Sequence, residues 1–146
     1  NTKFIKLAGK INDNRPNEIS KEILSYVKKH KLKKNILIMG ITYKKNSDDL
    51  RESPILKVYN FLNKKIKNKI LVCDPMLSNF TKKNLKNIKF VSLKELNSKK
   101  FFKRFDLCFI GSNHDTFNYK KITKNFKIIF DSRDSFDKLE NKIKII

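Results

Sequence analysis

The chain has 146 residues, about the length of one domain, and 39% of them are hydrophobic. These apolar residues form clear segments, which argues against disorder, and the longest run, "ILIMGI", is too short to cross a bilayer. The net charge of +21 favours polyanions, but the lysines are spread over the whole chain, so we interpret it mainly as a solvated surface and do not expect a nucleic-acid partner.

The N-terminal part is predicted to form two helices. Apolar residues from Phe4 to Ile11 follow helical spacing, and the chain begins inside this pattern with Asn1 rather than Met, so we expect a piece of a longer protein. The segment "NDNRPN" is predicted to end the first helix, because Pro16 suits the first turn of the next one. The second helix carries its apolar stripe on Ile19, Ile23 and Val27.

From Asn35 onwards, short apolar runs alternate with polar and helical segments. Ser53 and Pro54 predict a helix start, with Ser53 as the N-cap and Pro54 in the first turn. Strands that alternate with helices indicate a parallel sheet with helices on both faces. The predicted fold class is therefore α/β, a Rossmann-like doubly wound parallel sheet of about five strands, preceded by N-terminal helices. The expected strands are 35–40, 69–75, 89–93, 105–111 and 127–132, the further expected helices are 94–102 and 117–124, and the tail 142–146 is left open as an additional edge strand.

Two cysteines, Cys73 and Cys108, fall inside predicted buried strands, and neither has a His or Cys at metal-ligand spacing. We therefore expect no metal site and two free thiols in the core, which suits a reducing cytoplasm. The chain has only three glycines, so it contains neither a G-x-G-x-x-G turn nor a P-loop. By itself it is not expected to bind NAD in the standard way.

Polar side chains follow three of the predicted strands, at the ends where ligands bind in doubly wound folds. Tyr43 and Lys44 follow the first strand, His114 follows the fourth and Arg133 follows the fifth. A tyrosine ring can stack on a base, a lysine can neutralise a phosphate, and an arginine fork can bind a phosphate or carboxylate. We therefore predict a nucleotide or nucleotide-sugar site at Tyr43, Lys44 and Arg133. The residues alone leave equally open a plain surface lysine and an arginine that pairs with a neighbouring aspartate.

The charged segment "SDDLRES" is interpreted as a scaffold for the loop that precedes the helix. Asp48, Asp49 and Arg51 can pair among themselves, and Ser53 can cap the helix, whose N-terminus also favours nearby carboxylates. Paired aspartates also occur in metal and acid–base sites, but no further ligand lies nearby, so we favour the structural role. For His114 we likewise favour a structural role, because no nucleophile accompanies it.

The stretch "GITYKKNSDDLRESP" strongly resembles the signature that opens the C-terminal domain of the UDP-glucose/GDP-mannose dehydrogenase family, close to G-(L/F)-x-(F/Y)-K-x-x-x-D-D-x-R-x-(S/A)-P. The segment "INDNRPNEISKEI" is similar to the end of that family's central helical domain. "CDP" matches an aspartate–proline step after the next strand, and "DSR" matches an aspartate-x-arginine step near the end. The resemblance therefore covers essentially the whole chain.

The resemblance implies an oxidoreductase of three parts: an N-terminal NAD-binding Rossmann domain, a central helical dimerisation domain and a C-terminal UDP-binding domain. Residues 1–30 would end the central domain, and residues 31–146 would form the UDP-sugar-binding domain. Such enzymes oxidise the C6 alcohol of a sugar to a carboxylate with two NAD⁺, through covalent intermediates on a cysteine. The NAD site and that cysteine would lie upstream. This chain alone is therefore expected not to be catalytic, and the full-length enzyme is expected to be a cytoplasmic homodimer.

By similarity, Tyr43 takes the aromatic position beside the uracil, Lys44 the position that contacts the UDP-sugar, and Arg133 a position that reaches it. Two residues depart from the family pattern, since Lys45 stands where many relatives have proline and Asp134 where asparagine or glycine is common. "DDLRESP" is closer to the branch acting on UDP-N-acetylhexosamines, so we expect a UDP-N-acetylglucosamine or UDP-N-acetylmannosamine 6-dehydrogenase for bacterial surface polysaccharide. The alternatives are a UDP-glucose 6-dehydrogenase, a basic nucleic-acid-binding α/β module and a free-standing nucleotide-sensing or assembly module.

Overall fold

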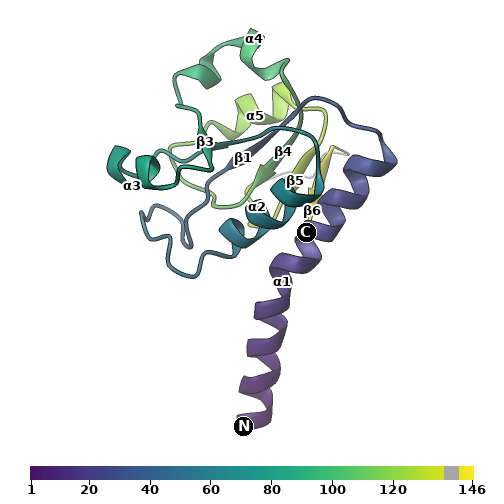
Figure 1. Cartoon of the computed structure of the whole chain (residues 1–146), viewed down its shortest axis with the longest axis vertical. Coiled ribbons are helices and arrows are strands. Elements are labelled where there is room, and N and C mark those ends of the chain that lie inside the picture. Colours follow the sequence, from purple (N-terminus) through teal and green to yellow (C-terminus); the bar gives the residue numbers. More distant parts are fainter. Residues whose placement is uncertain (137–141) are drawn as a thin grey trace.

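The computed structural model, which describes residues 1–136 and 142–146, is built around a parallel six-stranded sheet with the order β3-β2-β1-β4-β5-β6 (Figure 1). Each neighbouring pair of strands is parallel. This is the strand order of the dinucleotide-binding Rossmann fold, so the predicted α/β doubly wound fold class is confirmed. The strands are β1 Asn35–Met39, β2 Ile70–Cys73, β3 Lys89–Phe90, β4 Phe105–Ile110, β5 Ile129–Asp131 and β6 Ile143–Ile145.

The two central strands, β1 and β4, are almost entirely buried. Their register pairs Ile36 with Leu107 and Met39 with Ile110. A parallel strand that is covered on both faces reads as a continuous apolar run rather than an alternating one. This is why the sequence locates both strands well.

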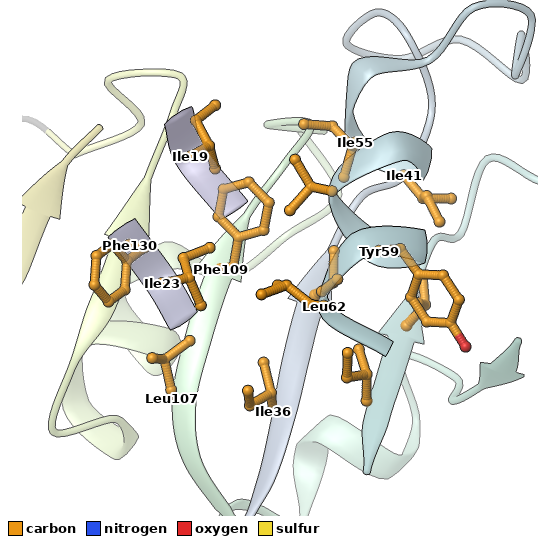
Figure 2. Close-up of a cluster of buried hydrophobic side chains, with 14 of the residues drawn as sticks. Ile19, Ile23, Ile36, Ile41, Ile55, Tyr59, Leu62, Leu107, Phe109 and Phe130 are labelled. Carbon is orange, nitrogen blue, oxygen red and sulfur yellow. The ribbon is translucent and has the colours of Figure 1, made fainter. Parts of the chain in front are cut away.

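Two helices, α1 (Thr2–Lys29) and α2 (Pro54–Lys65), cover one face of the sheet. Figure 2 shows side chains of both helices packed over the strands. α1 contributes Ile19 and Ile23, and α2 contributes Ile55 and Leu62, all of them 5% exposed or less. Full burial of one such aliphatic side chain contributes about 1.5–3 kcal/mol. This packing holds α1 and α2 next to each other on the sheet.

The other face is covered by the short 3-10 helix η1 (Glu95–Asn97), α4 (Lys99–Phe102) and α5 (Tyr119–Asn125). Its core is rich in phenylalanine: the rings of Phe102 and Phe126 meet edge to face with centroids 5.5 Å apart. Cys73 and Cys108 also belong to this core and are free thiols. The sheet therefore has a separate hydrophobic core on each face.

The prediction of two N-terminal helices is wrong, because α1 runs unbroken from Thr2 to Lys29 with Pro16 inside it. An internal proline costs about 3 kcal/mol, since it lacks an N–H and crowds the preceding turn. Here that cost is offset because Ile19, Ile23 and Val27 are buried against the rest of the fold. No described helix, α1 included, combines the length and hydropathy needed to cross a membrane. The N-terminal half of α1 extends away from the sheet, as Figure 1 shows, and exposes Phe4, Ile5, Leu7 and Ile11.

The tail forms β6 at the edge of the sheet, the possibility left open for residues 142–146, so the sheet has six strands. Two smaller features differ from the prediction. The helix expected over 94–102 is split into η1 and α4 at Ser98, whose ψ of 123° is extended. Helix α3 (Asn79–Asn84) was not predicted, although Ser78 caps it by accepting the Thr81 N–H at 3.1 Å. The helix expected near 117–124 is present as α5.

Gly40 and Gly111 allow the ends of β1 and β4 to approach each other closely. Gly40 has a φ of +77°, and a Cβ there would lie 2.3 Å from the carbonyl oxygen of Ser112. A Cβ on Gly111 would lie 2.5 Å from the carbonyl oxygen of Gly40 and 2.5 Å from Cγ2 of Ile55. The close approach brings the loops after β1 and β4 together.

Replacing Gly40 by alanine is expected to lower the free energy of unfolding by about 2–4 kcal/mol, because the new Cβ overlaps Ser112 and the positive φ is strained. Chemical denaturation followed by circular dichroism measures this loss. The matched control is Gly9→Ala in α1, where a Cβ meets nothing within 4 Å and alanine favours the helix. The control should not lose stability, and an equal loss in both variants would contradict the interpretation.

Candidate functional site

A cavity of about 620 Å³ opens at the carboxyl ends of the strands, lined by α1, the loop after β1, the start of α2 and the end of β5. Tyr43, Lys44 and Arg133, the three residues predicted to bind a nucleotide-sugar, all line it. Its volume is in the range of small-molecule sites. Other residues that line the cavity were not predicted to belong to a site, among them Asn12, Asp13 and Arg15 of α1, Glu52, and Lys57 of α2.

The loop after β1 is held by a buried carboxylate at the end of β2. Oδ2 of Asp74 accepts the N–H groups of Ile41 at 2.8 Å and Thr42 at 3.3 Å, and Oδ1 accepts the N–H of Met76 at 3.0 Å. Burial alone would raise the pKa of the Asp74 carboxyl, but the hydrogen bonds from His114 and Ile41 outweigh burial and hold the pKa below its ordinary value. Asp74 therefore ties the ends of β1 and β2 together as an anion.

Two serines fix the carbonyl groups of the same segment. Oγ of Ser53 donates to the Ile41 carbonyl at 2.6 Å and accepts the Leu56 N–H at 3.2 Å, so Ser53 is also the N-cap of α2. Oγ of Ser112 donates to the Thr42 carbonyl. The backbone N–H and C=O groups of Ile41 and Thr42 are therefore all bonded to side chains, which gives the start of the loop one defined shape.

Arg133 fastens this loop to the end of β4. Its Nε donates to the Gly111 carbonyl at 2.8 Å, and its Nη2 donates to the Tyr43 carbonyl at 3.2 Å. Among the described residues no carboxylate pairs with the guanidinium, and Asp131 instead accepts the backbone N–H of Arg133 at 2.9 Å. A guanidinium has five N–H donors, so the described residues use two of them and leave three for a ligand.

Tyr43 and Lys44 present their side chains at the cavity. The Tyr43 backbone is held on both sides, since its N–H donates to the Asp49 carbonyl at 2.9 Å and its carbonyl accepts from Arg133, yet the residue is 44% exposed. The Lys44 Nζ lies 5.8 Å from the centroid of the Tyr43 ring. An open aromatic face beside an ammonium group suits a base together with a phosphate.

In the segment "SDDLRES", Asp49 and Arg51 form a pair. Nε and Nη2 of Arg51 each donate to the Asp49 carboxylate at 3.0 Å, and this hydrogen bonding holds the pKa of Asp49 below its ordinary value. Ser53 acts as the helix cap described above. Asp48 is exposed, and its carboxylate forms no hydrogen bond or ion pair with the described residues, so the geometry gives it no part in the scaffold.

His114 is fully buried and faces Asp74. Its Nε2 lies 3.2 Å from Oδ2 of Asp74, and its Nδ1 accepts the backbone N–H of Asn46 at 2.9 Å. The imidazole therefore supports the loop, which is the structural role favoured for it from the sequence. Sequence reasoning included Asp74 in the matched "CDP" step without giving it a role, and it did not single out Ser112. The available signal for Asp74 was a charged residue directly after an apolar strand.

The turn after β1 does not fit the pyrophosphate of a dinucleotide. Dinucleotide-binding turns leave backbone N–H groups free for the phosphates and use several glycines to let them approach. Here Asp74 already accepts the N–H groups of Ile41 and Thr42, and no glycine follows Gly40 in the loop. The turn after β1 therefore lacks the free N–H groups and the glycines of a dinucleotide-binding turn. In the part of the chain that the structure describes, no group of three or more His, Cys, Asp or Glu is arranged to hold a metal ion.

Residues 37–138 match the sequence profile of the UDP-glucose/GDP-mannose dehydrogenase family, UDP binding domain. The chain is 37% identical over 95 residues to the UDP-N-acetyl-D-mannosamine dehydrogenase of Campylobacter jejuni, and this alignment covers 64% of this chain and 23% of that protein. It is 44% identical over 63 residues to the protein of the same name from Methanococcus maripaludis, and this alignment covers 42% of this chain and 15% of that protein. The matched part of the chain thus spans less than a quarter of these relatives.

Two solved structures share the fold. The UDP-D-ManNAc dehydrogenase of Pyrococcus horikoshii superposes with a TM-score of 0.71 at 23% identity, over 96% of this chain and 32% of that chain. The UDP-N-acetyl-mannosamine dehydrogenase of Staphylococcus aureus superposes with a TM-score of 0.66 at 22% identity, over 92% of this chain and 30% of that chain. At these identities the likeness establishes the fold.

Replacing Asp74 by asparagine is expected to destabilise the chain by about 2–4 kcal/mol at neutral pH, because buried N–H groups lose a charged acceptor. The pKa of Asp74 lies below the value of about 3.9 that an aspartate has in an unfolded chain. Its contribution to stability is therefore complete above that pH and is lost as the pH falls through the lower, folded-state pKa. Urea unfolding at a series of pH values measures both effects.

In these titrations the unmodified chain should lose stability below about pH 4, and Asp74→Asn should lose less over the same window. The matched control is Asp48→Asn, because Asp48 is exposed and its carboxylate forms no hydrogen bond or ion pair with the described residues. It should change the free energy of unfolding by less than about 0.5 kcal/mol. Equal acid sensitivity of the unmodified chain and Asp74→Asn would show that Asp74 does not hold the loop as an anion.

Both thiols are expected to be unreactive in the folded chain. Burial, and to a smaller extent Asp74, raises the pKa of the Cys73 thiol to about 12, and burial raises the pKa of Cys108 well above its ordinary value. Little thiolate, the reactive form, is therefore present near neutral pH. A thiol reagent such as iodoacetamide should label neither cysteine before unfolding and both after unfolding in guanidinium chloride. Rapid labelling of the folded chain would refute this reading of the core.

Proposed function

This chain belongs to the UDP-glucose/GDP-mannose dehydrogenase family, and from that premise we propose that it is the UDP-sugar-binding portion of an NAD-dependent nucleotide-sugar 6-dehydrogenase. The observation that carries the proposal is that Tyr43, Lys44 and Arg133 line one cavity at the carboxyl ends of the strands. In this role the Tyr43 ring stacks on the uracil, and Lys44 neutralises the diphosphate.

Arg133 serves the proposed site in two ways. Its bonds to the carbonyl groups of Tyr43 and Gly111 orient the guanidinium, and the donors that the described residues leave unused reach the UDP-sugar. Arg15 and Lys57 line the same cavity and add positive charge next to the diphosphate. The site therefore combines one aromatic face with several cations, which suits a nucleoside diphosphate better than an uncharged ligand.

The proposed reaction of the full-length protein is oxidation of the C6 alcohol of the sugar to a carboxylate, with reduction of two NAD⁺. The relatives described above carry the name UDP-N-acetyl-D-mannosamine dehydrogenase, so the proposed substrate is a UDP-N-acetylhexosamine rather than UDP-glucose. The turn after β1 does not fit NAD, because Asp74 already accepts its N–H groups. Both cysteines are buried in the core, so we assign a catalytic role to neither Cys73 nor Cys108. The part assigned to this chain is to bind and orient the substrate.

The remaining assignments concern the organisation of the whole protein. We assign residues 1–30 to the end of a central helical domain and residues 31–146 to the UDP-sugar-binding domain, within a homodimeric enzyme. The free thiols of Cys73 and Cys108 support a reducing compartment, and we therefore place the protein in the cytoplasm. Its proposed pathway is the synthesis of bacterial surface polysaccharide.

Isothermal titration with UDP tests the proposal. Lys44→Ala is expected to weaken UDP binding by about 10- to 100-fold, the equivalent of one charged hydrogen bond. The matched control is Lys86→Ala, because Lys86 is an exposed lysine between α3 and β3 and does not line the cavity. The control should bind UDP like the unmodified chain.

Failure of the folded protein to bind UDP, or an equal loss in both lysine variants, would contradict the proposed function. A parallel titration with single-stranded and duplex DNA separates it from the nucleic-acid alternative. A module that binds through its overall charge would bind DNA tightly, with an affinity that falls steeply as salt rises, and would show no preference for UDP.

A further inference from the structure

A buried imidazole of defined protonation lies behind the proposed nucleotide site. The backbone N–H of Asn46 can only donate, and it lies 2.9 Å from Nδ1 of His114, so Nδ1 carries a lone pair and no proton. Nε2 lies 3.2 Å from Asp74, so the ring proton points at that carboxylate. Since both side chains are 0% exposed, no water competes for these positions. The two bonds fix His114 as one neutral tautomer.

Asn46 is fastened to the loop after β4 through its side chain as well. Its Nδ2 donates to the Asp115 carboxylate at 2.7 Å, and its Oδ1 accepts the Asp115 N–H at 2.9 Å. Its φ of 55° lies in the left-handed region, which asparagine tolerates better than most residues. The Lys45 Nζ also contacts Asp115, at 2.7 Å. With the bond to His114, these contacts anchor the far end of the segment that begins at Ile41.

Tyr43 and Lys44 lie between two attachment points of the segment, one at Ile41 and Thr42 and the other at Asn46. The buried pair of Asp74 and His114 forms both of them. Asp74 binds the start of the segment through the N–H groups of Ile41 and Thr42, and it also holds the ring of His114, which binds the segment again at Asn46. The Tyr43 and Lys44 side chains are exposed, so the backbone between the anchors sets their direction.

We propose that His114 is a positioning residue of the nucleotide site: it accepts the Asn46 N–H through an unprotonated Nδ1, and thereby fixes the direction in which Tyr43 and Lys44 enter the cavity. This inference rests on the proposed function of that cavity. It makes UDP affinity depend on a group that does not line the cavity. The acceptor at Nδ1, rather than the bulk of the ring, is the part of His114 that carries the effect.

Two substitutions separate the bond at Nδ1 from the contacts at Nε2, which faces Asp74 and also lies 3.4 Å from the Thr42 hydroxyl. In His114→Asn, the amide oxygen takes the place of Nδ1 and still accepts from Asn46, but the side chain is too short to reach Asp74. In His114→Gln, the amide N–H takes the place of Nε2 and still donates to Asp74, but the Asn46 N–H loses its acceptor. Both variants lose the buried ring, so both should unfold at a lower temperature, and this shared loss is the internal control.

The expected result is an asymmetry between the variants. His114→Gln should weaken UDP binding by about tenfold, the effect of losing one hydrogen bond, whereas His114→Asn should stay within about threefold of the unmodified chain. Hydrogen exchange at the amides of Tyr43 and Asn46, which donate to the Asp49 carbonyl and to His114, should rise by about tenfold or more in His114→Gln and remain near its original rate in His114→Asn. Equal losses of affinity in both variants, or unchanged affinity and exchange in His114→Gln, would overturn the proposal.

A spectroscopic measurement on the unmodified chain does not depend on how the variants fold. The ¹⁵N shifts of the His114 ring should report a protonated Nε2 and an unprotonated Nδ1, and the opposite tautomer would overturn the proposal. The outcomes also distinguish the two claims about the cavity. If the unmodified chain does not bind UDP, the proposed function fails, while the exchange rates of the two variants still decide whether His114 positions the loop.

Discussion

The buried carboxylate of Asp74 is the constraint on which the rest of the candidate site depends. A buried anion is costly unless donors surround it, and Asp74 meets this condition with backbone N–H groups from two loops and the ring of His114. These donors come from the loops after β1, β2 and β4, so the carboxylate can be satisfied only when the ends of all three strands are correctly placed. The cost of burying one charge is thereby coupled to the geometry of the whole sheet edge.

This constraint also explains how a Rossmann strand order is combined with a different mode of binding. The N–H groups after β1, which hold a pyrophosphate in dinucleotide-binding turns, are here bonded to Asp74. In the proposed site, recognition at this edge therefore comes from side chains, and the longer loop supplies the ring of Tyr43 and the ammonium of Lys44, which line the cavity. The fold is retained, and the chemistry at the end of its first strand is replaced.

The sequence predicts the features that depend on local chemistry and fails where distant residues decide. Buried strands read as apolar runs, and Ser53 with Pro54 marks the start of α2, so these elements could be predicted. The local rule for proline failed at Pro16 because tertiary burial of the following turns outweighs it. The bonds of Asp74 to Ile41 and His114 join residues 33 and 40 positions apart, a relation that no periodicity reports. Arg15 and Lys57 were missed for the same reason, since only the packed fold brings α1 and α2 to the cavity.

The large positive charge of the chain is unselective over most of the surface, and at this cavity it is arranged together with an aromatic ring and two carboxylates. Spread over the surface, a net charge of +21 attracts any polyanion and weakens with added salt. At the cavity, cations from α1, α2 and the loop after β1 lie together with the carboxylates of Asp13 and Glu52 and the open ring of Tyr43. Such a mixed lining disfavours a continuous phosphate backbone, because the acidic groups interrupt the positive surface, whereas a compact diphosphate that carries a base can use the cations and the ring at once. Under the proposed function, the general charge of the chain acts on the approach of anions, and the choice among them falls to the few side chains that the Asp74 carboxylate and its neighbours hold in place.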